Sequence, residues 1–313
     1  MVNFTIQMED IIRVKVVKGF LLGLSSLQLF LSLSLFGIAF TLNTTILNPD
    51  YMTSELDEMD ISSLAEEYLH EHITEAIPEG LDFITTETIN NIMDDAEPWI
   101  REQVDTVILK SCDYLLGKSD SLNLTISTEP LVTILKANLW EALLESPPPL
   151  VAGLPSDILE TQFNILFQEF SEEIPSTLEL AKSMIPPEVI EQLELAREYL
   201  HYFQIGYKAL IAFIALMIIA IILLYHEVIG TTRSLGITFL TYGVLEYGGI
   251  LATKHLALPQ LPLYGIPPSL QPWISQFISG LLHPLEMLSI GFMAGGVVLL
   301  IVSFVYKPRQ SEL

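Results

Sequence analysis

The stretch that decides the fold is residues 206–225, GYKALIAFIALMIIAIILLY, in which residues 209–225 carry no charge. Two more runs of the same length follow it: residues 234–253, SLGITFLTYGVLEYGGILAT, with Glu246 as their single charge, and residues 287–306, MLSIGFMAGGVVLLIVSFVY, with none. About 20 apolar residues, each rising ~1.5 Å, cross the ~30 Å hydrocarbon core of a bilayer. Soluble helices of this length alternate polar and apolar faces, so the three runs predict membrane-spanning helices within residues 206–306.

A fourth span is predicted near the N-terminus, at residues 19–42, which are uncharged. This run is too long for the core of a typical signal peptide and lacks an A-x-A cleavage pattern, so it indicates an uncleaved signal anchor. Residues 1–18 place Arg13, Lys15 and Lys18 just before it. Because basic residues stay on the cytoplasmic side, we expect residues 1–18 to be cytoplasmic.

The remaining basic residues extend this topology. Arg233 lies in the short segment between the second and third spans, and Lys307 and Arg309 lie in the tail, residues 307–313. The positive-inside rule assigns both segments to the cytoplasm. We therefore expect a multi-pass protein of the plasma membrane, with both termini cytoplasmic and residues 43–205 outside.

The charge of the chain is segregated in the same way. The net charge is −24 over 313 residues; residues 43–205 hold 32 acidic and 6 basic side chains (−26), and the rest holds 6 acidic and 8 basic (+2). Such an acidic domain repels nucleic acid and favours divalent cations or a basic partner, although solvation alone also explains it. Cys112 is the single cysteine, so no internal disulfide forms, which favours a prokaryotic source.

The acidic domain is predicted to be mostly helical. The patterns indicate helices at residues 61–73, from Pro98 to just before Gly117, and at residues 129–144, with a short strand or an extended arm near residues 122–126. Two more helices follow Pro155, and the last of them runs from the Pro186–Pro187 pair without a break to Tyr225. The fold class is therefore an all-α membrane protein with four transmembrane helices and a helical extracytoplasmic domain between helices 1 and 2. Residues 254–286 predict a proline-rich outer loop ending in an amphipathic interfacial helix anchored by Trp273, serving as a connector or as a cap over an opening.

Two short motifs resemble an uncharacterised group of prokaryotic four-pass envelope proteins with a large outer helical domain. They are Leu47-Asn48-Pro49-Asp50-Tyr51, after the first span, and Tyr114-Leu115-Leu116-Gly117-Lys118-Ser119-Asp120, in the acidic domain. The resemblance implies this architecture along nearly the whole chain. It implies no activity and no functional residue.

Glu246 is the sharpest functional signal, because ionisable residues within a membrane are costly and often functional. Its neighbours at helical spacing are small or polar, which predicts that this face points into the helix bundle. A glycine face on the last span is predicted to pack closely against it. Glu246 is either a proton or cation site or a protonated side chain that joins two helices by a hydrogen bond. The site residues are Glu246, Tyr242 and Thr253, and the packing residues are Gly243, Gly249, Gly291 and Gly295.

A second polar cluster is expected at the outer membrane surface, made of Lys254, His255, His283 and Glu286. Its histidine spacing fits no known zinc pattern, so we predict no metal site and no cofactor. His70 and His72 are two residues apart and point to opposite sides of a helix, which excludes H-E-x-x-H chemistry. Asn123 is a possible glycosylation site, in an N-x-T triplet.

The sequence also lacks the G-x-S-x-G, Walker A, G-x-G-x-x-G and kinase motifs. We therefore expect a non-enzymatic envelope protein that binds a partner, senses, or assembles into an oligomer through its acidic domain. The alternative is an oligomeric ion or proton channel or transporter that uses Glu246.

Overall fold

The computed structural model describes residues 2–59, 84–149, 151–180, 186–261 and 266–306. The helix predicted at residues 61–73, with His70 and His72, lies outside these ranges. The chain divides into two units, each described by itself below. The membrane unit comprises Met1–Leu47, His201–Pro262 and Phe277–Leu313, and the acidic unit comprises Asn48–Leu200 and Leu263–Gln276.

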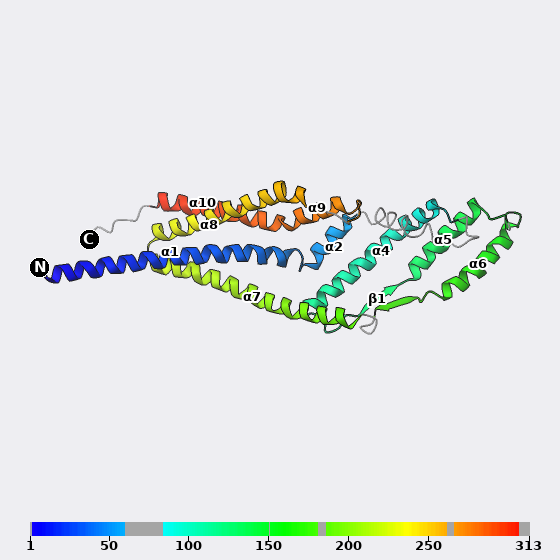
Figure 1. Cartoon of the computed structure of the whole chain (residues 1–313), viewed down its shortest axis with the longest axis horizontal. Helices are drawn as coiled ribbons and strands as arrows, with labels where there is room; N and C mark the ends of the chain where they lie inside the picture. Colours follow the sequence, from blue (N-terminus) through cyan, green and yellow to red (C-terminus); the bar gives the residue numbers. More distant parts are fainter. Residues whose placement is uncertain (1, 60–83, 150, 181–185, 262–265, 307–313) are drawn as a thin grey trace. The chain divides into compact units, whose positions relative to one another are not determined.

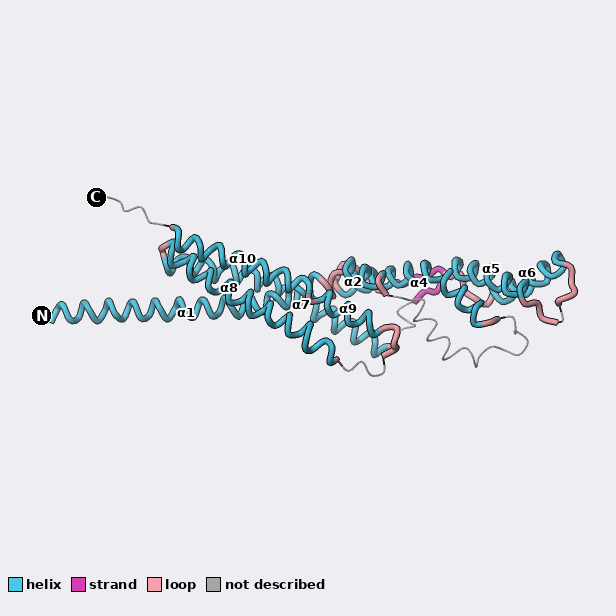
Figure 2. Tube along the Cα trace, turned by 90° about the horizontal axis from the view of Figure 1, so that it is seen from above, coloured by secondary structure: helices cyan, strands magenta, loops and turns pink. Residues whose placement is uncertain are grey.

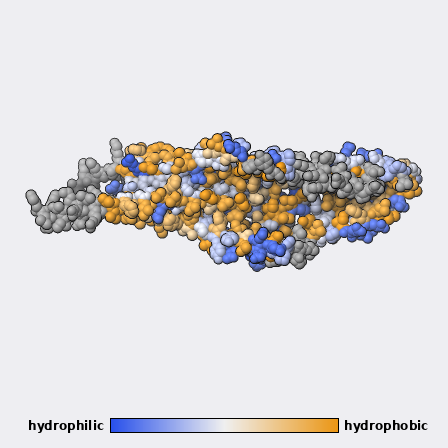
Figure 3. All heavy atoms as spheres, viewed as in Figure 1, coloured by the Kyte–Doolittle hydropathy of each residue, from blue (hydrophilic) through white to orange (hydrophobic). Residues whose placement is uncertain are grey.

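Within the described ranges, four helices are long and apolar enough to cross a bilayer, and they confirm the four predicted spans. They are α1 (Val2–Thr44), α7 (Pro187–Tyr225), α8 (Val228–Ala252) and α10 (His283–Val305). Hydrophobic side chains cover most of the visible face of the membrane unit (Figure 3). Because water does not tolerate so much exposed apolar surface, the chain is an integral, multi-pass membrane protein.

Helices α8 and α10 run side by side, yellow and red in Figure 1 and again adjacent in Figure 2. Their backbones meet at three glycines. A Cβ atom built on Gly243 would lie 2.6 Å from the carbonyl oxygen of Ser289, one on Gly236 would lie 3.0 Å from the carbonyl oxygen of Gly296, and one on Gly296 would lie 2.7 Å from the amide nitrogen of Leu240. Small residues allow this close approach. Within lipid the hydrophobic effect does not hold helices together, so the van der Waals contacts of such a close approach stabilise the pair instead.

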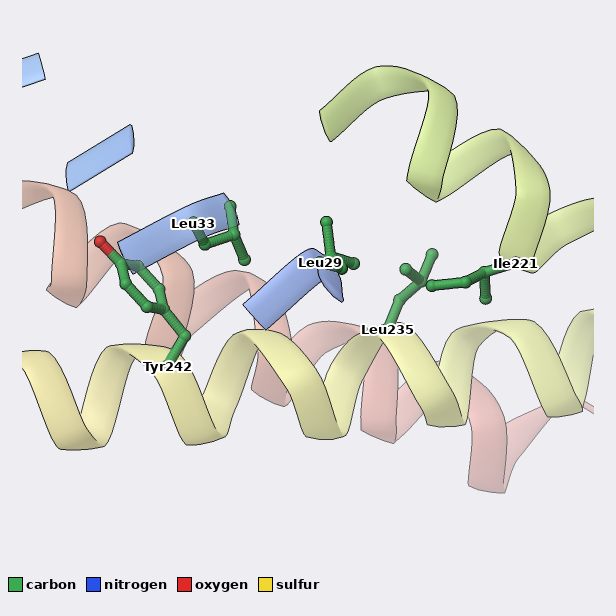
Figure 4. Packing of buried hydrophobic residues seen from close by; sticks show 5 residues of the cluster. All are labelled: Leu29, Leu33, Ile221, Leu235 and Tyr242. Atoms are coloured by element: carbon green, nitrogen blue, oxygen red, sulfur yellow. The ribbon is translucent and has the colours of Figure 1, made fainter. Parts of the chain in front are cut away.

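The core of the membrane unit lies between α1, α7 and α8. Leu29, Leu33, Ile221, Leu235 and Tyr242 form it, and none is more than 7% exposed. Figure 4 shows Tyr242 rising from α8 toward α1, beside Leu33, while Leu29 meets Leu235 and Ile221. The middle of the unit is therefore filled by packed side chains.

The two ends of α8 differ. At its start, His226 has a φ of 53°, in the left-handed region, and this residue ends α7 and reverses the chain. At its finish, the helix widens into a π-turn, Thr253–Ala257, before the 3₁₀ turn Leu258–Gln260. The helix predicted in the outer loop is present as α9 (Gln271–Leu281).

In the acidic unit, α2 (Pro49–Asp57) precedes α4 (Thr86–Leu115), α5 (Glu129–Glu145) and α6 (Ser156–Glu172). The prediction that α4 starts at Pro98 was wrong, because this proline lies inside the helix. The helix begins after Thr85, whose hydroxyl and that of Thr88 cap each other's backbone amides in a capping box. The predicted strand is confirmed as β1 (Leu124–Ser127), paired antiparallel with β2 (Thr177–Leu180).

The two motifs quoted above both lie at helix ends. Asn48 caps α2 by accepting a hydrogen bond from the amide of Asp50. Gly117 follows the end of α4 with a φ of 73°, a conformation that other residues rarely adopt. Near this turn, Tyr114 donates a hydrogen bond of 2.6 Å to Glu194, and the Arg197 guanidinium lies 5.0 Å from the Tyr114 ring. The second motif therefore joins the end of α4 to the start of α7.

Two further contacts define the acidic unit. Arg101 donates from its guanidinium to the carbonyl oxygens of Leu56, Asp57 and Met59, at 2.9, 3.0 and 2.7 Å, so it binds the last turn of α2. Trp273 donates its indole N–H to the carbonyl oxygen of Glu55 at 2.8 Å. Trp273, predicted to be an interfacial anchor, thus makes a protein contact within this unit.

Candidate functional site

Glu246 lies on the face of α8 that packs within the membrane unit. Tyr242 and Ile250, one turn before it and one turn after it, are 0% and 3% exposed, whereas Glu246 itself is half-buried. The predicted hydrogen bond from Glu246 to a facing helix is not formed. Among the described residues, its carboxyl group has no hydrogen-bond or ion-pair partner. The group is therefore available to a proton, a cation or water.

Tyr242 is the most buried polar side chain beside Glu246. Its ring meets Phe30 and Phe292 edge to face, with centroids 6.4 and 5.2 Å away. Its hydroxyl is enclosed, and within the described ranges it has no hydrogen-bond partner. A buried hydroxyl group without a hydrogen bond destabilises the fold by about 1–3 kcal/mol, because it has lost its contact with water and gained no partner.

The hydroxyl of Thr41 on α1 is a second enclosed polar atom of the membrane unit without a partner in the described part of the chain. On α1, Thr41 lies one turn beyond Gly37, and Gly37 contacts the hydroxyl of Tyr242. On α8, Glu246 lies one turn beyond Tyr242. Helices α1 and α8 run in the same direction, since Ser26 meets Ser234 and Gly37 meets Tyr242 farther along both. Thr41 and Glu246 therefore share one level of the unit.

The other members of the predicted stripe lie elsewhere. Thr253 is exposed, and its hydroxyl donates to the carbonyl oxygen of Gly249 at 3.0 Å, within its own helix. A Cβ atom on Gly249, Gly291 or Gly295 would meet nothing within 4 Å. Of the four glycines expected at the helix contact, Gly243 alone is there; the faces of Gly249, Gly291 and Gly295 are open. The packing surface of α10 is rotated by about one residue from the G-x-x-x-G face, onto Gly296.

The outer polar cluster contains an ion pair that the sequence analysis missed. Lys254 Nζ lies 2.6 Å from Glu286 Oε2, and both side chains are about one-fifth exposed, at 20% and 21%. His255 and His283 are exposed. Among the described residues, no three His, Cys, Asp or Glu side chains are grouped as metal ligands would be. The pair neutralises Glu286, so Glu246 is the uncompensated acid of α8 and α10.

Two predicted residues lie in the acidic unit. Asn123 is exposed immediately before β1, so its side chain is accessible. Cys112 is half-buried, and burial, followed by the nearby Asp113 carboxylate, raises the pKa of its thiol. A raised pKa keeps the thiol protonated at neutral pH, which disfavours a nucleophilic role.

Comparison of the chain with models of known protein families, with curated proteins and with solved structures found no match. The resemblance to four-pass envelope proteins therefore stays a prediction. What the chain does must be argued from its own residues.

Thr41 is a polar residue that sequence reasoning did not find, and within the expected outer cluster it did not foresee that Lys254 pairs with Glu286. Thr41 is an uncharged residue near the end of an apolar run, so its burial depends on which face of α1 meets α8. Lys254 and Glu286 are 32 positions apart, and spacing within one helix says nothing about such a pair.

Proposed function

We propose that this protein is a non-enzymatic integral membrane protein of the plasma membrane that holds its acidic unit outside the cell, where the unit binds a partner with a basic surface. The observation that carries the proposal is the segregation of charge. All 32 acidic and 6 basic residues counted between residues 43 and 205 fall within the acidic unit, which gives it a net charge of −26. A field of this sign attracts cationic partners and repels nucleic acid.

Four of the six basic residues of the acidic unit are already used within it. Arg101 pairs with Glu97, Lys118 with Asp113 and Arg197 with Asp120, at 2.5, 3.2 and 3.4 Å. Lys136 lies over the ring of Phe167, 6.0 Å from its centroid. Most of the carboxylates are therefore left without an internal counter-charge, which supports an external one.

Photo-crosslinking in intact cells, followed by purification of the tagged full chain, tests partner binding. We expect a basic protein in the cross-linked product, captured less well as the salt concentration rises, because exposed charges are screened over about 10 Å at 0.1 M salt. Replacing Glu160, Glu169 and Glu172 of α6 by Gln should reduce the yield. Recovery of the chain alone under every salt condition would refute the proposal.

Protease added to intact cells tests the topology separately. We expect loss of the acidic unit and survival of a tag placed after Leu313. Digestion of the tag, with the acidic unit spared, would reverse the orientation.

The second candidate is a proton or cation pathway formed by an oligomer, and it is favoured by Glu246. Glu246 is half-buried, and neither its carboxyl group nor the Tyr242 hydroxyl one turn away has a partner among the described residues, so the pair is suited to holding a proton. In liposomes reconstituted with the full chain, Glu246→Gln should abolish ion flux at unchanged thermal stability. Glu227→Gln, at an exposed acid that forms no ion pair with a described residue, is the control outside this group. Absence of flux from the unaltered chain would exclude this candidate.

A further inference from the structure

A cavity of about 490 Å³ lies where α7 turns into α8, at the opposite end of the membrane unit from the Lys254–Glu286 pair. Its polar walls come from Ser26 on α1 and from Glu227, Arg233, Ser234 and Thr238 around the start of α8. All five belong to the membrane unit. A volume of this size is typical of sites that hold small molecules or headgroups.

The cavity lies at the depth of the bilayer boundary. Ser26 hydrogen-bonds Ser234, the first residue of the third predicted span, so both lie at the end of that span where α7 turns into α8. Tyr225 ends one span and Val228 begins the next. A molecule in the cavity therefore sits at the level of lipid headgroups.

The charges that line the cavity are not neutralised from within. Arg233 and Glu227 are both exposed, and neither forms an ion pair with a described residue. The guanidinium group of arginine matches two oxygens of a phosphate at once. The first turn of α8 forms part of the wall and adds the positive end of the helix dipole.

The hydroxyl groups complete a polar floor. Ser26 Oγ and Ser234 Oγ lie 3.1 Å apart and share one hydrogen bond, while Thr238 donates to the carbonyl oxygen of Ser234 at 3.0 Å. Two serine hydroxyls carry two protons, and their mutual bond uses one. The other proton is available to a bound oxygen.

The remaining walls are apolar. Tyr225, Ile229 and Ile237 line the cavity, and Ile237 is 50% exposed on a helix apolar enough to cross the bilayer. A ligand with a charged head and an apolar tail fits this combination, because the tail can leave along Ile237 into the bilayer. A small, fully polar ion would leave these side chains uncovered.

We propose that this cavity binds the headgroup of a membrane phospholipid, with the phosphate diester on Arg233 and the Ser26–Ser234 pair, and a headgroup ammonium on Glu227. The two opposite charges, on Arg233 and Glu227, favour a zwitterionic headgroup over an anionic one. The site does not depend on the function of the acidic unit.

Native mass spectrometry of the full chain in detergent tests the site, with short-chain phosphatidylethanolamine, phosphatidylglycerol and diacylglycerol as probes and inorganic phosphate as competitor. We expect phosphatidylethanolamine to bind best and diacylglycerol not to bind. Arg233→Gln should weaken binding about tenfold or more, the effect of losing hydrogen bonds to a charged group. Lys18→Gln, which alters an exposed basic residue of α1 outside the cavity, should leave binding unchanged.

Two further variants examine the selectivity and the location. Glu227→Gln should remove the preference for phosphatidylethanolamine over phosphatidylglycerol, and Ser234→Leu should fill the cavity and abolish binding of both. Equal losses with Arg233→Gln and Lys18→Gln would indicate general attraction to lipid and overturn the proposal. So would binding of diacylglycerol at the same affinity. Displacement of lipid by millimolar inorganic phosphate would show that the site takes a free anion instead.

Discussion

Gly37 of α1 lies directly against the phenol oxygen of Tyr242 on α8: a Cβ atom at Gly37 would stand 2.5 Å from that oxygen and 2.8 Å from Cδ1 of Leu285. Three helices of the membrane unit thus meet at a residue without a side chain. We expect Gly37→Ala to lower the stability of the full chain in detergent by about 1–3 kcal/mol, the usual cost of overpacking. Gly23→Ala, on the same helix in open space, is the control and should not destabilise. Equal thermal shifts for the two variants would contradict this contact.

Removing the hydroxyl of Tyr242 should cost little. Tyr242→Phe keeps the edge-to-face contacts with Phe30 and Phe292 and deletes a buried group that has no described partner, so stability should be unchanged or higher by up to about 1 kcal/mol. Thermal unfolding of the variant and of the unaltered chain in the same detergent measures this difference in stability. In the double variant with Gly37→Ala, the loss should be smaller than for Gly37→Ala alone, because the clash loses an atom. A loss above about 1 kcal/mol for Tyr242→Phe would mean that the hydroxyl is bonded in the native state.

The glycines of α8 and α10 should separate into two classes. Gly243→Ala and Gly296→Ala place a methyl group against backbone atoms of the other helix and should each cost about 1–3 kcal/mol. Gly291→Ala and Gly295→Ala meet no atom and should be neutral or stabilising, because alanine favours a helix by up to about 1 kcal/mol over glycine. Melting temperatures of the four variants distinguish the classes. Destabilisation by Gly295→Ala alone would show that its face is covered, for instance by a second copy.

Arg101 should hold the end of α2 in the acidic unit. Arg101→Lys keeps the charge but reaches fewer of the three carbonyl oxygens of Leu56, Asp57 and Met59. Since hydrogen bonds to charged groups contribute about 1.5–3 kcal/mol, we expect hydrogen exchange of the α2 amides to rise by tenfold or more. Lys110→Gln, at an exposed position farther along α4, is the control. Unchanged protection of α2 in Arg101→Lys would refute this role.

Asp105 should give the acidic unit a measurable pH dependence. Burial, and then repulsion from Asp57, raise the pKa of Asp105, although Arg101 opposes this. A raised pKa in the folded state means that the carboxylate is tolerated less when folded, so stability is lost as the pH rises through that pKa. Asp105→Asn should therefore raise the free energy of unfolding at pH 7 by less than about 1 kcal/mol, and the melting temperature should rise with it. The difference should shrink as the pH falls toward 4, and a constant difference from pH 4 to 7 would contradict the assignment.

Much of this fold follows from the sequence alone. The four spans are determined by composition, because a run of about 20 apolar residues has no stable place except a bilayer, and a helix satisfies its own backbone there. The unbroken helix α7, the strand at Leu124 and the chain reversal at Gly117 also follow from local signals. Each of these features depends on residues that are close together in the sequence, so the sequence is enough to predict it.

Predictions from local sequence motifs were wrong where another motif or a tertiary contact had the stronger effect. Pro98 is a typical first residue of a helix, yet the capping box at Thr85 and Thr88 starts α4 earlier and carries the proline into its interior. The G-x-x-x-G spacing of Gly291 and Gly295 is typical of packed helices, yet α10 turns Gly296 toward α8 instead. Which glycines touch depends on the rotation of a whole helix, and the side chains of every neighbouring helix fix that rotation together.

By itself, the sequence determined that this chain crosses a membrane and that its charge is carried by a separate helical unit. The tertiary structure alone decided which polar groups meet. It encloses the hydroxyl of Tyr242 against Gly37 and pairs Lys254 with Glu286. It leaves Glu246 without a partner among the described residues, and it gathers Ser26, Glu227 and Arg233 around one cavity. The physical reason is that each span is stabilised by the transfer of its own residues from water to lipid, and this free energy can be read from one segment at a time. A site depends on how different helices are rotated and aligned against one another, and no single segment contains that information.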